Sequence, residues 1–417
     1  MIAQRSYDCL VMGAGPAGCC AAALVAESGF STLLVERDKM PRFHVGESLM
    51  PETYWAFERL GILDEMLRIA FTRKNGVQFV NADDKETQPF IFSEFDEHPS
   101  AVTWHVERAK FDQLLLDTAY NRGATVVDET RVLDIELKKS PPHKVMLKLA
   151  NGREQEVSAR VVVDATGQQS LIANRLGLRE YYEDLKKAAV WTYFEGARRN
   201  GGANPEVTCI LHTRNKEAWF WYIPLSDGTV SVGLVGDNEY VLKRGGSPES
   251  RFREEMKNCP GILRRTQDAR IVSRFHVAKE FSYITKKQAG DGWVLIGDAA
   301  GFIDPIYSSG VFLALKSATM AADAVISGLA SGNVSARVLG SWTEQYENGV
   351  APIRKLVRAF YTKPFSFGEF IRTFPHHREN LVRLLVGKTF EGNPHEIFED
   401  MDPWIEDLKQ KSAPALA

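Results

Sequence analysis

The sequence predicts an α/β fold: a Rossmann-like dinucleotide-binding domain, an antiparallel β-sheet inserted into it, and a helical C-terminal region. Three observations predict this arrangement. A strand–glycine–helix pattern occupies residues 7–26, alternating apolar strands run between residues 180 and 275, and a helical pattern begins near residue 345. The length of 417 residues also exceeds the size at which one hydrophobic core keeps growing.

The first elements are expected at residues 7–26, YDCLVMGAGPAGCCAAALVA, where an apolar run is followed by a glycine-rich turn and an alanine-rich helix. The turn has G-x-G-x-x-G spacing and consists of Gly13, Ala14, Gly15, Pro16, Ala17 and Gly18. Glycines permit the tight turn, the approach of the backbone to a pyrophosphate, and close packing of the helix on the strand. The helix N-terminus offers free N–H groups to the phosphates. Together these features favour a bound dinucleotide over a glycine-rich turn without a ligand.

Acidic residues at the ends of later strands indicate which dinucleotide binds. Glu36 ends the strand STLLVE, where a carboxylate can accept hydrogen bonds from ribose hydroxyls. Another strand ends in Asp164, followed by Thr166 and Gly167, and a third ends before Asp298. Ligands of doubly wound sheets bind beyond these carboxyl ends. Asp298 suits a polyol chain, which FAD carries as its ribityl group and nicotinamide dinucleotides lack, so FAD is expected.

Several segments, in order, resemble the FAD-binding framework of the group A flavin monooxygenases and flavin-dependent halogenases. They are GAGPAG, Glu36, RFHVGES (42–48), VERAKFD (106–112), DATG and GDAAGFIDP. The resemblance implies a glutathione-reductase-type FAD domain similar to that of p-hydroxybenzoate hydroxylase. The further residues that it implies near FAD are Arg37, Arg42, Ser48, Arg108, Gly310 and Val311.

The motif WFWYIP (219–224) favours the halogenase branch. Both branches are known to form a flavin C4a-hydroperoxide, which a hydroxylase offers directly to its substrate and a halogenase offers to halide. The resulting hypohalous acid then travels to a separate substrate pocket. The family motif W-x-W-x-I-P is matched by Trp219, Trp221, Ile223 and Pro224. Period-2 geometry puts both tryptophans on one sheet face, as a wall between flavin and substrate. The alternative is aromatic core packing.

Lys74 matches the family's active-site lysine in its K-x-G-x-x-F context, with Gly76 and Phe79. The resemblance implies that its amine receives the hypohalous acid, either by hydrogen bonding or, if neutral, as a chloramine. Burial would lower the pKa of the amine and raise its neutral fraction. The alternative is a solvated loop lysine beside Arg73.

The turn PIYSSGV (305–311) resembles the family's halide-binding turn, which implies that the backbone N–H groups of Ser309 and Gly310 hold chloride or bromide. A helix N-terminus binds anions for electrostatic reasons. The tryptophan-halogenating branch has a glutamate where this chain has Tyr307. We therefore expect the branch that acts on phenols or pyrroles.

Six segments are predicted along the chain. Residues 1–74, 107–179 and 276–345 form the FAD-binding domain, 75–106 and 180–275 a substrate-side sheet, and 346–417 a helical region or lid. Residues 353–388 contain eight Lys or Arg against two Glu, and residues 391–407 contain seven acids. Such runs are typical of a solvated amphipathic face. The other interpretation is a lid whose basic face receives an acidic acyl-carrier protein or its phosphopantetheine arm.

Composition restricts location and partners. A net charge of −3 argues against nucleic acid, and no run of roughly 18–20 apolar residues predicts a membrane span. No secretory signal is evident, so a cytoplasmic protein is expected. The cysteines, Cys9, Cys19, Cys20, Cys209 and Cys259, match no metal or redox motif and are expected to be buried free thiols.

The leading hypothesis is a halogenase that uses reduced FAD, oxygen and chloride or bromide on an electron-rich phenol or pyrrole, free or carrier-tethered. No second Rossmann motif is visible, so a separate flavin reductase is expected to supply reduced FAD. The alternatives are an aromatic hydroxylase, a flavin-dependent isoprenoid or lipid reductase, and a flavin-carrying binding protein without turnover.

Overall fold

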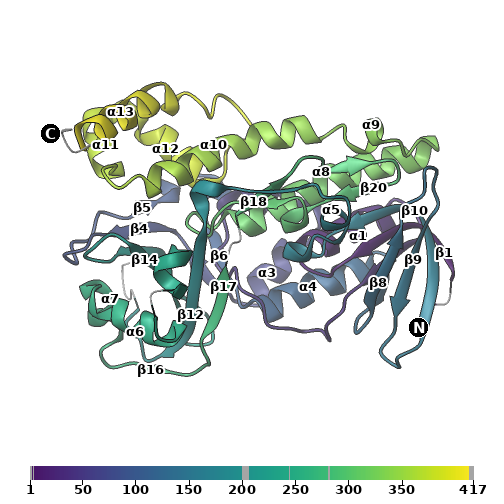
Figure 1. Cartoon of the computed structure of the whole chain (residues 1–417), viewed down its shortest axis with the longest axis horizontal. Coiled ribbons are helices and arrows are strands. Elements are labelled where there is room, and N and C mark those ends of the chain that lie inside the picture. Colours follow the sequence, from purple (N-terminus) through teal and green to yellow (C-terminus); the bar gives the residue numbers. More distant parts are fainter. Residues whose placement is uncertain (1, 3, 200–205, 244, 280–281, 413–417) are drawn as a thin grey trace.

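The computed structural model describes residues 2, 4–199, 206–243, 245–279 and 282–412. Two β-sheets lie next to each other, one on the right of Figure 1 and one on the left. Helices α10–α13 run along the top of the figure, above the left-hand sheet.

The right-hand sheet has a parallel core in the order β20-β10-β1-β2-β7. Its parallel strands are β1 (Ser6–Met12), β2 (Thr32–Val35), β7 (Thr125–Val127), β10 (Glu154–Asp164) and β20 (Trp293–Leu295). Antiparallel strands extend it: β8 (Arg131–Glu136), β9 (His143–Lys148) and β19 (Ala289–Gly290). Helix α1 (Pro16–Glu27) contacts both α4 (Arg108–Asn121) and α8 (Ser309–Ser331). Because helices cover it, β1 is an apolar run that is buried from Cys9 to Met12.

Four of the parallel strands end at the same edge of this sheet. Met12 is in register with Val35 and Asp164, and Asp164 is in register with Leu295. The turns that follow these four residues therefore meet in one place, as the doubly wound arrangement predicts.

The left-hand sheet has the order β16-β12-β15-β14-β13-β4-β5, and β17 also pairs with β12. Its strands are β4 (Gly76–Val80), β5 (Phe90–Ile91), β12 (Lys187–Glu195), β13 (Val207–His212), β14 (Ala218–Pro224), β15 (Thr229–Asp237), β16 (Arg270–Ile271) and β17 (His276–Lys279). Both segments predicted for the substrate side contribute strands. β17, which lies just beyond 275, does so too, and the division into six segments stays a prediction.

Smaller elements complete the fold. They are β3 (Thr72–Lys74) paired with β6 (Thr103–His105), the three-stranded group β11 (Arg179–Tyr181), β18 (Tyr283–Thr285) and β21 (Gly301–Phe302), and the helices α2 (Tyr54–Arg59), α3 (Leu63–Arg68), α5 (Leu171–Arg175) and α9 (Ala336–Leu339).

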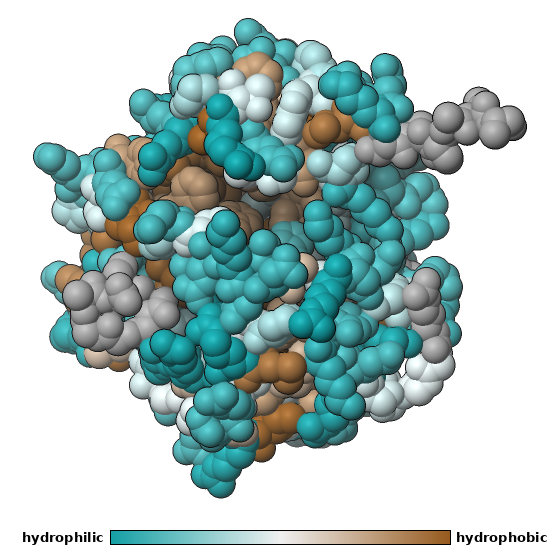
Figure 2. Space-filling view, turned by 90° about the vertical axis from the view of Figure 1, so that its left-hand side faces the viewer, coloured by the Kyte–Doolittle hydropathy of each residue, from teal (hydrophilic) through white to brown (hydrophobic). Residues whose placement is uncertain are grey.

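The C-terminal helices are α10 (Thr343–Tyr361), α11 (Phe367–Thr373), α12 (Arg378–Val386) and α13 (Ile397–Ser412). Figure 2 shows an apolar hollow beneath them, at the end of the molecule that lies on the left of Figure 1. Six of the eight basic residues between 353 and 388 form ion pairs with acids of the same chain: Arg354, Lys355, Arg358, Lys363, Arg372 and Lys388. Four of these pairs, those of Lys355, Arg358, Lys363 and Lys388, join different elements of the fold.

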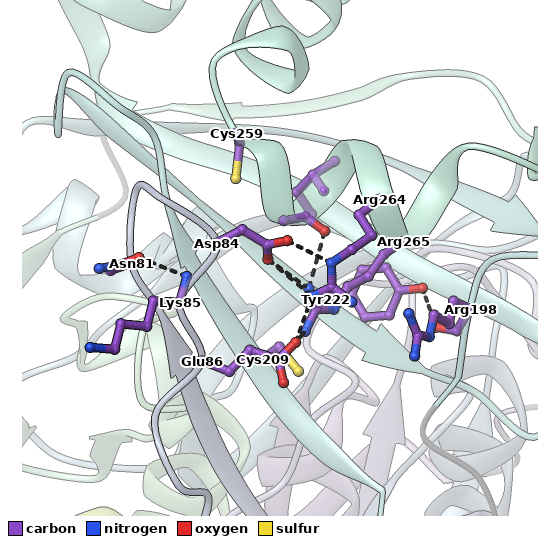
Figure 3. Close-up of polar contacts among 12 residues, drawn as sticks. Asn81, Asp84, Lys85, Glu86, Arg198, Cys209, Tyr222, Cys259, Arg264 and Arg265 are labelled. Carbon is purple, nitrogen blue, oxygen red and sulfur yellow. Dashed lines mark hydrogen bonds and ion pairs between the residues drawn. The ribbon is translucent and has the colours of Figure 1, made fainter.

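Helix α7 (Pro260–Thr266) holds the connection between β4 and β5 through ion pairs (Figure 3). Arg264 bonds both carboxylate oxygens of Asp84, at 2.5 and 3.0 Å, and reaches Glu86 at 2.6 Å. Arg265 also donates to Glu86 at 2.6 Å. Hydrogen bonding to Arg264 lowers the pKa of Asp84, as expected for a carboxylate beside a guanidinium.

The cysteines and the longest apolar helix are both largely buried. All five cysteines are free and buried, as predicted. Among the described residues, only α8 is long and apolar enough to span a bilayer, but 67% of its most apolar window is buried inside the protein. It contacts α1, as expected of a core helix.

Candidate active site

A cavity of about 740 Å³ lies at the carboxyl edge of the parallel strands, and residues of both sheets line it. This volume is typical of small-molecule and cofactor sites. The predicted cofactor residues on its lining are Gly13, Gly15, Pro16, Ala17, Glu36, Arg37, Arg42, Ser48, Arg108, Thr166, Gly167, Asp298, Gly310 and Val311. Gly18 and Asp164 are not on its lining.

The glycine turn leaves open space at only one of its three glycines. A Cβ at Gly13, where φ is +99°, would lie 2.4 Å from the carbonyl oxygen of Ala165, and one at Gly18 would lie 1.9 Å from that of Gly13. The fold therefore needs both glycines. The nearest atom to a Cβ at Gly15 is Arg42 Nη2, at 3.7 Å. The space beside Gly15 opens into the cavity at the start of α1, which fits a phosphate group.

Glu36 is held beside this turn. Its Oε2 accepts a hydrogen bond from the backbone N–H of Ala14 at 2.8 Å, and its Oε1 accepts one from Asp38 at 3.0 Å. Only 6% of the residue is exposed. These bonds fix a carboxylate at the cavity edge, where FAD would present a ribose hydroxyl.

Two arginines converge on the buried carboxylate of Asp112, on α4. Arg108 donates to its two oxygens at 2.8 and 3.1 Å, and Arg42 donates to Oδ2 at 3.1 Å. Arg42 also lies 3.8 Å from Glu36 Oε2, and both arginines line the cavity. Their guanidinium groups are suited to bind a pyrophosphate there.

Asp164, which ends β10, and Asp298, which follows β20, have different positions. Asp164 is fully buried and accepts hydrogen bonds from Thr166 N at 3.0 Å, Thr166 Oγ1 at 2.6 Å and Ile172 N at 2.7 Å. It therefore shapes the turn that brings Thr166 and Gly167 to the cavity. Asp298 faces the cavity itself. Burial raises the pKa of Asp298 to about 6, and the nearby charge of Arg108 partly opposes this.

Strand β14 forms part of the cavity wall. Trp219, Trp221 and Ile223 line the cavity and belong to the main hydrophobic core, whereas Phe220 and Tyr222 face a second core on the opposite side of the sheet. The alternation expected of a strand is therefore observed. Pro224, at the end of β14, does not line the cavity.

Each tryptophan of the wall is held by a hydrogen bond. Trp221 Nε1 donates to Ser231 Oγ at 3.1 Å, and Trp219 Nε1 donates to the hydroxyl of Tyr361 at 3.1 Å. The ring of Trp221 lies over Gly233 of β15, where an added Cβ would be 2.1 Å from Cζ2. No larger residue fits at position 233 unless the ring moves.

Lys74 ends β3 and does not line the cavity. It is 3% exposed, and its Nζ donates to the carbonyl oxygen of Leu49 at 2.8 Å. Burial lowers the pKa of the amine to about 7. The alternative of a solvated loop lysine is therefore wrong.

His105 is a buried residue that is bonded to the cavity lining and senses the charge of Lys74. Its ring donates from Nδ1 to the carbonyl of Pro224 at 3.1 Å, and its Nε2 accepts from Thr208 Oγ1 at 2.9 Å; Thr208 lines the cavity. Burial and the positive charge of Lys74 hold the pKa of His105 well below its usual range. A neutral imidazole is therefore bonded to Thr208 of the cavity lining and lies close enough to Lys74 to feel its charge.

The predicted halide residues lie at the start of α8. Gly310 lines the cavity, whereas Ser309 is buried and does not. Ser308 precedes the helix with a positive φ of 60°, and its Oγ donates to Ser48 Oγ at 3.0 Å. This bond ties the start of α8 to the segment that contains Ser48.

Sequence reasoning missed Glu47, which lies inside the quoted segment RFHVGES. It lines the cavity, is 3% exposed, and accepts a hydrogen bond from the hydroxyl of Tyr193 at 2.5 Å. Its Oε2 has no hydrogen-bond partner among the described residues. Burial raises the pKa of Glu47 to about 7, although Tyr193, Ser231 and Arg108 oppose the change. Asp112 and His105 were missed as well, because Arg42, which shares Asp112 with Arg108, and both partners of His105 are distant in sequence.

Family models identify the chain. A model described as tryptophan halogenase matches residues 94–365, and one described as FAD dependent oxidoreductase matches residues 8–175. The chain belongs to the flavin-dependent halogenases. Its predicted family, fold class and FAD cofactor are therefore confirmed.

Two curated relatives of this halogenase are similar over nearly the whole chain. It is 28% identical to the 1H-pyrrole-2-carbonyl-(peptidyl-carrier protein) chlorinase of Pseudomonas fluorescens, over 96% of this chain and 93% of that protein. It is 31% identical to the corresponding brominase of Pseudoalteromonas luteoviolacea, over 93% of both.

Solved halogenase structures share its fold. The flavin-dependent brominase Bmp2 has a TM-score of 0.86 and 28% identity, covering 98% of this chain and 100% of that one. The myxobacterial chondrochloren halogenase CndH has a TM-score of 0.79 and 29% identity, covering 97% and 98%.

Proposed function

We propose that this halogenase modifies a pyrrole ring carried as a pyrrole-2-carbonyl group on a peptidyl-carrier protein. The relatives that carry this activity in their names match the chain along nearly all of their length. Tyr307, in place of the glutamate of the tryptophan-halogenating branch, also favours an electron-rich ring such as a pyrrole. Bound reduced FAD would supply hypohalous acid, made from oxygen and chloride or bromide.

One observation carries the proposal: apolar side chains of β14 line the FAD cavity, and the buried amine of Lys74 lies outside it. Trp219, Trp221 and Ile223 face the cavity, whereas Lys74 does not reach it. A hydroxylase needs direct contact between flavin and substrate, which such a wall prevents. A halogenase needs the separation, because only the small oxidant has to pass.

The residue roles follow from this arrangement. Arg42 and Arg108 would bind the pyrophosphate, and Glu36 and Asp298 would accept hydrogen bonds from hydroxyl groups of FAD. Backbone N–H groups of Ser309 and Gly310, at the start of α8, would hold halide. Lys74 would receive the hypohalous acid, and its pKa near 7 would leave the amine partly neutral at physiological pH.

The apolar hollow in Figure 2 is a suitable entrance for a ring on a carrier arm. Aromatic rings from separate elements meet beside α11: Phe79 of β4 is 6.2 Å from Phe367 of α11, and Tyr307 is 6.4 Å from Phe367. Such rings can pack against a flat pyrrole. Internal ion pairs already engage most basic residues of the C-terminal helices, so we expect shape rather than a basic surface to dominate carrier recognition.

The test compares substrates under one set of conditions. The purified protein is incubated with a separate flavin reductase, NADH, FAD, and bromide or chloride. The substrates are pyrrole-2-carbonyl carrier protein, free pyrrole-2-carboxylate and a phenol. We expect a halogen mass increment on the carrier-bound ring and little on the free acid.

Three results would overturn parts of this proposal. Halide-independent hydroxylation would exclude the halogenase chemistry. Preferential halogenation of the free phenol would exclude the carrier-bound substrate while keeping the reaction. Turnover with NADH but without added reductase would exclude the diffusible supply of reduced FAD.

A further inference from the structure

A cluster of two histidines and one aspartate joins two C-terminal segments, away from the FAD cavity. His376 and His377 belong to a short 3-10 turn (Pro375–His377) that precedes α12, and Asp400 lies on α13. One ligand atom from each of the three lies within 4.8 Å of the others. Asp400 Oδ2 is 3.3 Å from Nε2 of His376 and 3.0 Å from Nε2 of His377.

Two of the three separations in this cluster match the edges of a small coordination polyhedron. Tetrahedral zinc with ligand bonds of about 2.0–2.1 Å requires its ligand atoms to lie roughly 3.3 Å apart. The two measured N···O distances, 3.0 and 3.3 Å, are close to that value. Both imidazoles present the same type of nitrogen, Nε2, to one oxygen of the carboxylate, and the three atoms lie within 4.8 Å of one another.

The orientation of His377 is fixed from several sides. Its ring is stacked on Phe370 with an interplanar angle of 9° and a centroid distance of 5.8 Å, and 2% of the residue is exposed. The side-chain amide of Asn380 lies 3.3 Å from its Nδ1. A metal-binding histidine normally donates its other ring N–H to such a polar group, and the Asn380 amide oxygen provides that acceptor if the amide is turned.

The remaining ligands leave access for the ion. The side chain of His376 is 62% exposed and that of Asp400 is 41% exposed. A metal ion can therefore enter from solvent and keep a water molecule as its fourth ligand. Two imidazole nitrogens and one carboxylate oxygen form a ligand set that suits zinc.

We propose that His376, His377 and Asp400 bind a zinc ion that fastens α13 to the start of α12. Phe370, on which His377 is stacked, also contacts Trp404 of α13, at 5.6 Å between ring centroids. The ion would therefore reinforce the packing of helices that cover the apolar hollow. The proposal is independent of the substrate proposed above, because no residue of the cluster lines the FAD cavity.

The test measures zinc binding directly. After chelator treatment, the full-length protein is titrated with Zn²⁺ in a calorimeter, and Co²⁺ is added in a parallel experiment to record its visible absorption. We expect one Zn²⁺ per chain, a tetrahedral Co²⁺ spectrum, and a rise of roughly 2–4 °C in Tm with saturating zinc.

Two variants separate the proposed site from other binding. His376→Ala removes an exposed ligand, and Asp400→Asn keeps the shape of the side chain, so neither should prevent folding. Each should weaken Zn²⁺ binding at least tenfold and abolish the Tm rise. His395→Ala and Asp402→Asn alter exposed residues of the same region and should bind zinc like the wild type. Equal zinc binding by all four variants, or none by the wild type, would overturn the proposal.

Discussion

Burial of the Lys74 amine lowers its pKa to about 7, so the charged and neutral forms coexist near neutral pH. The lysine donates one hydrogen bond, to the carbonyl of Leu49, and its charge depresses the pKa of His105. A buried amine with so few polar partners is costly for folding when it is charged. Such an arrangement is typical of a functional lysine rather than a structural one.

Glu47→Gln replaces a buried carboxyl that titrates with an amide of similar size that does not. Burial raises its pKa from 4.5 to about 7, so the folded protein keeps a proton that the unfolded chain releases between these pH values. The stability that this group contributes is complete below pH 4.5 and is lost as pH rises through 7. Relative to Glu47→Gln, the wild type should lose up to roughly 3 kcal/mol of unfolding free energy between about pH 5 and pH 8.

Urea unfolding at several pH values measures this difference. Glu97→Gln, at an exposed position, serves as the control and should follow the wild type. Parallel profiles for the wild type and Glu47→Gln would contradict the prediction. The groups that face Glu47 are Tyr193, Ser231, Arg108 and Asp227, and they are unchanged in the variant.

Asp112→Asn tests the arrangement of the two arginines. The substitution leaves Arg42 and Arg108 partly buried without their shared anion, which should destabilise the protein without FAD by about 3 kcal/mol. The pyrophosphate of FAD would replace the missing charge, so added FAD should restore much of the lost stability. Thermal unfolding with and without FAD measures both effects. Asp117→Asn, exposed on the same helix, is the control. If Asp112→Asn lost the same amount of stability with FAD as without it, this account would be contradicted.

At this scale, the sequence could predict residues whose role follows from local spacing. Gly13, Gly15 and Gly18 are recognisable because turn, phosphate and helix packing impose one short pattern. Asp112 and Glu47 were not predicted, because a polar residue type does not reveal burial. The partners of these residues, such as Arg42 for Asp112 and Tyr193 for Glu47, are many residues away and meet them only in the fold.

At the scale of elements, β14 and β15 form a pair in which one residue of β15 makes room for a ring of β14. Gly233→Ala would place a Cβ against the Trp221 ring, so the ring must shift toward the cavity. We expect a loss of about 1–3 kcal/mol in unfolding free energy and weaker FAD binding. In a Trp221→Phe background the same substitution should cost much less, because the smaller ring leaves room.

A double-mutant cycle measures this coupling. Unfolding free energies and FAD dissociation constants are determined for the wild type, both single variants and the double variant. Additive effects would show that the Trp221 ring does not occupy the space over Gly233. Additivity would also remove the support for a rigid wall at this point.

The alternation of β14 was predictable because a strand has a strict period of two residues. The pairing of its neighbours was not, since β13 pairs with β14 on one side and with β4, more than 100 residues earlier, on the other. The basic run of the C-terminal helices was also ambiguous. Its ion pairs reach acids as distant as Asp96 and Asp184, which no local pattern reveals.

At the scale of the whole molecule, the FAD cavity lies where the two sheets meet, and the wall belongs to the second sheet. The sequence predicted the first sheet well, because strand ends, glycines and acids recur in a known order. It predicted the presence of a second sheet but not its strand order. The burial of Lys74 depends on how distant parts of the chain pack together, and no short segment of the sequence reveals that packing.

The most direct test of the central claim is a pair of product measurements on Lys74→Met. The variant keeps a long apolar side chain and should bind FAD like the wild type. If the oxidant forms in the FAD cavity and needs Lys74 to reach the substrate, a small scavenger such as monochlorodimedone should still be halogenated. Halogenation of the substrate should fall at least about 100-fold, or ~2.7 kcal/mol in activation free energy. Substrate halogenation within about threefold of the wild type would contradict the account.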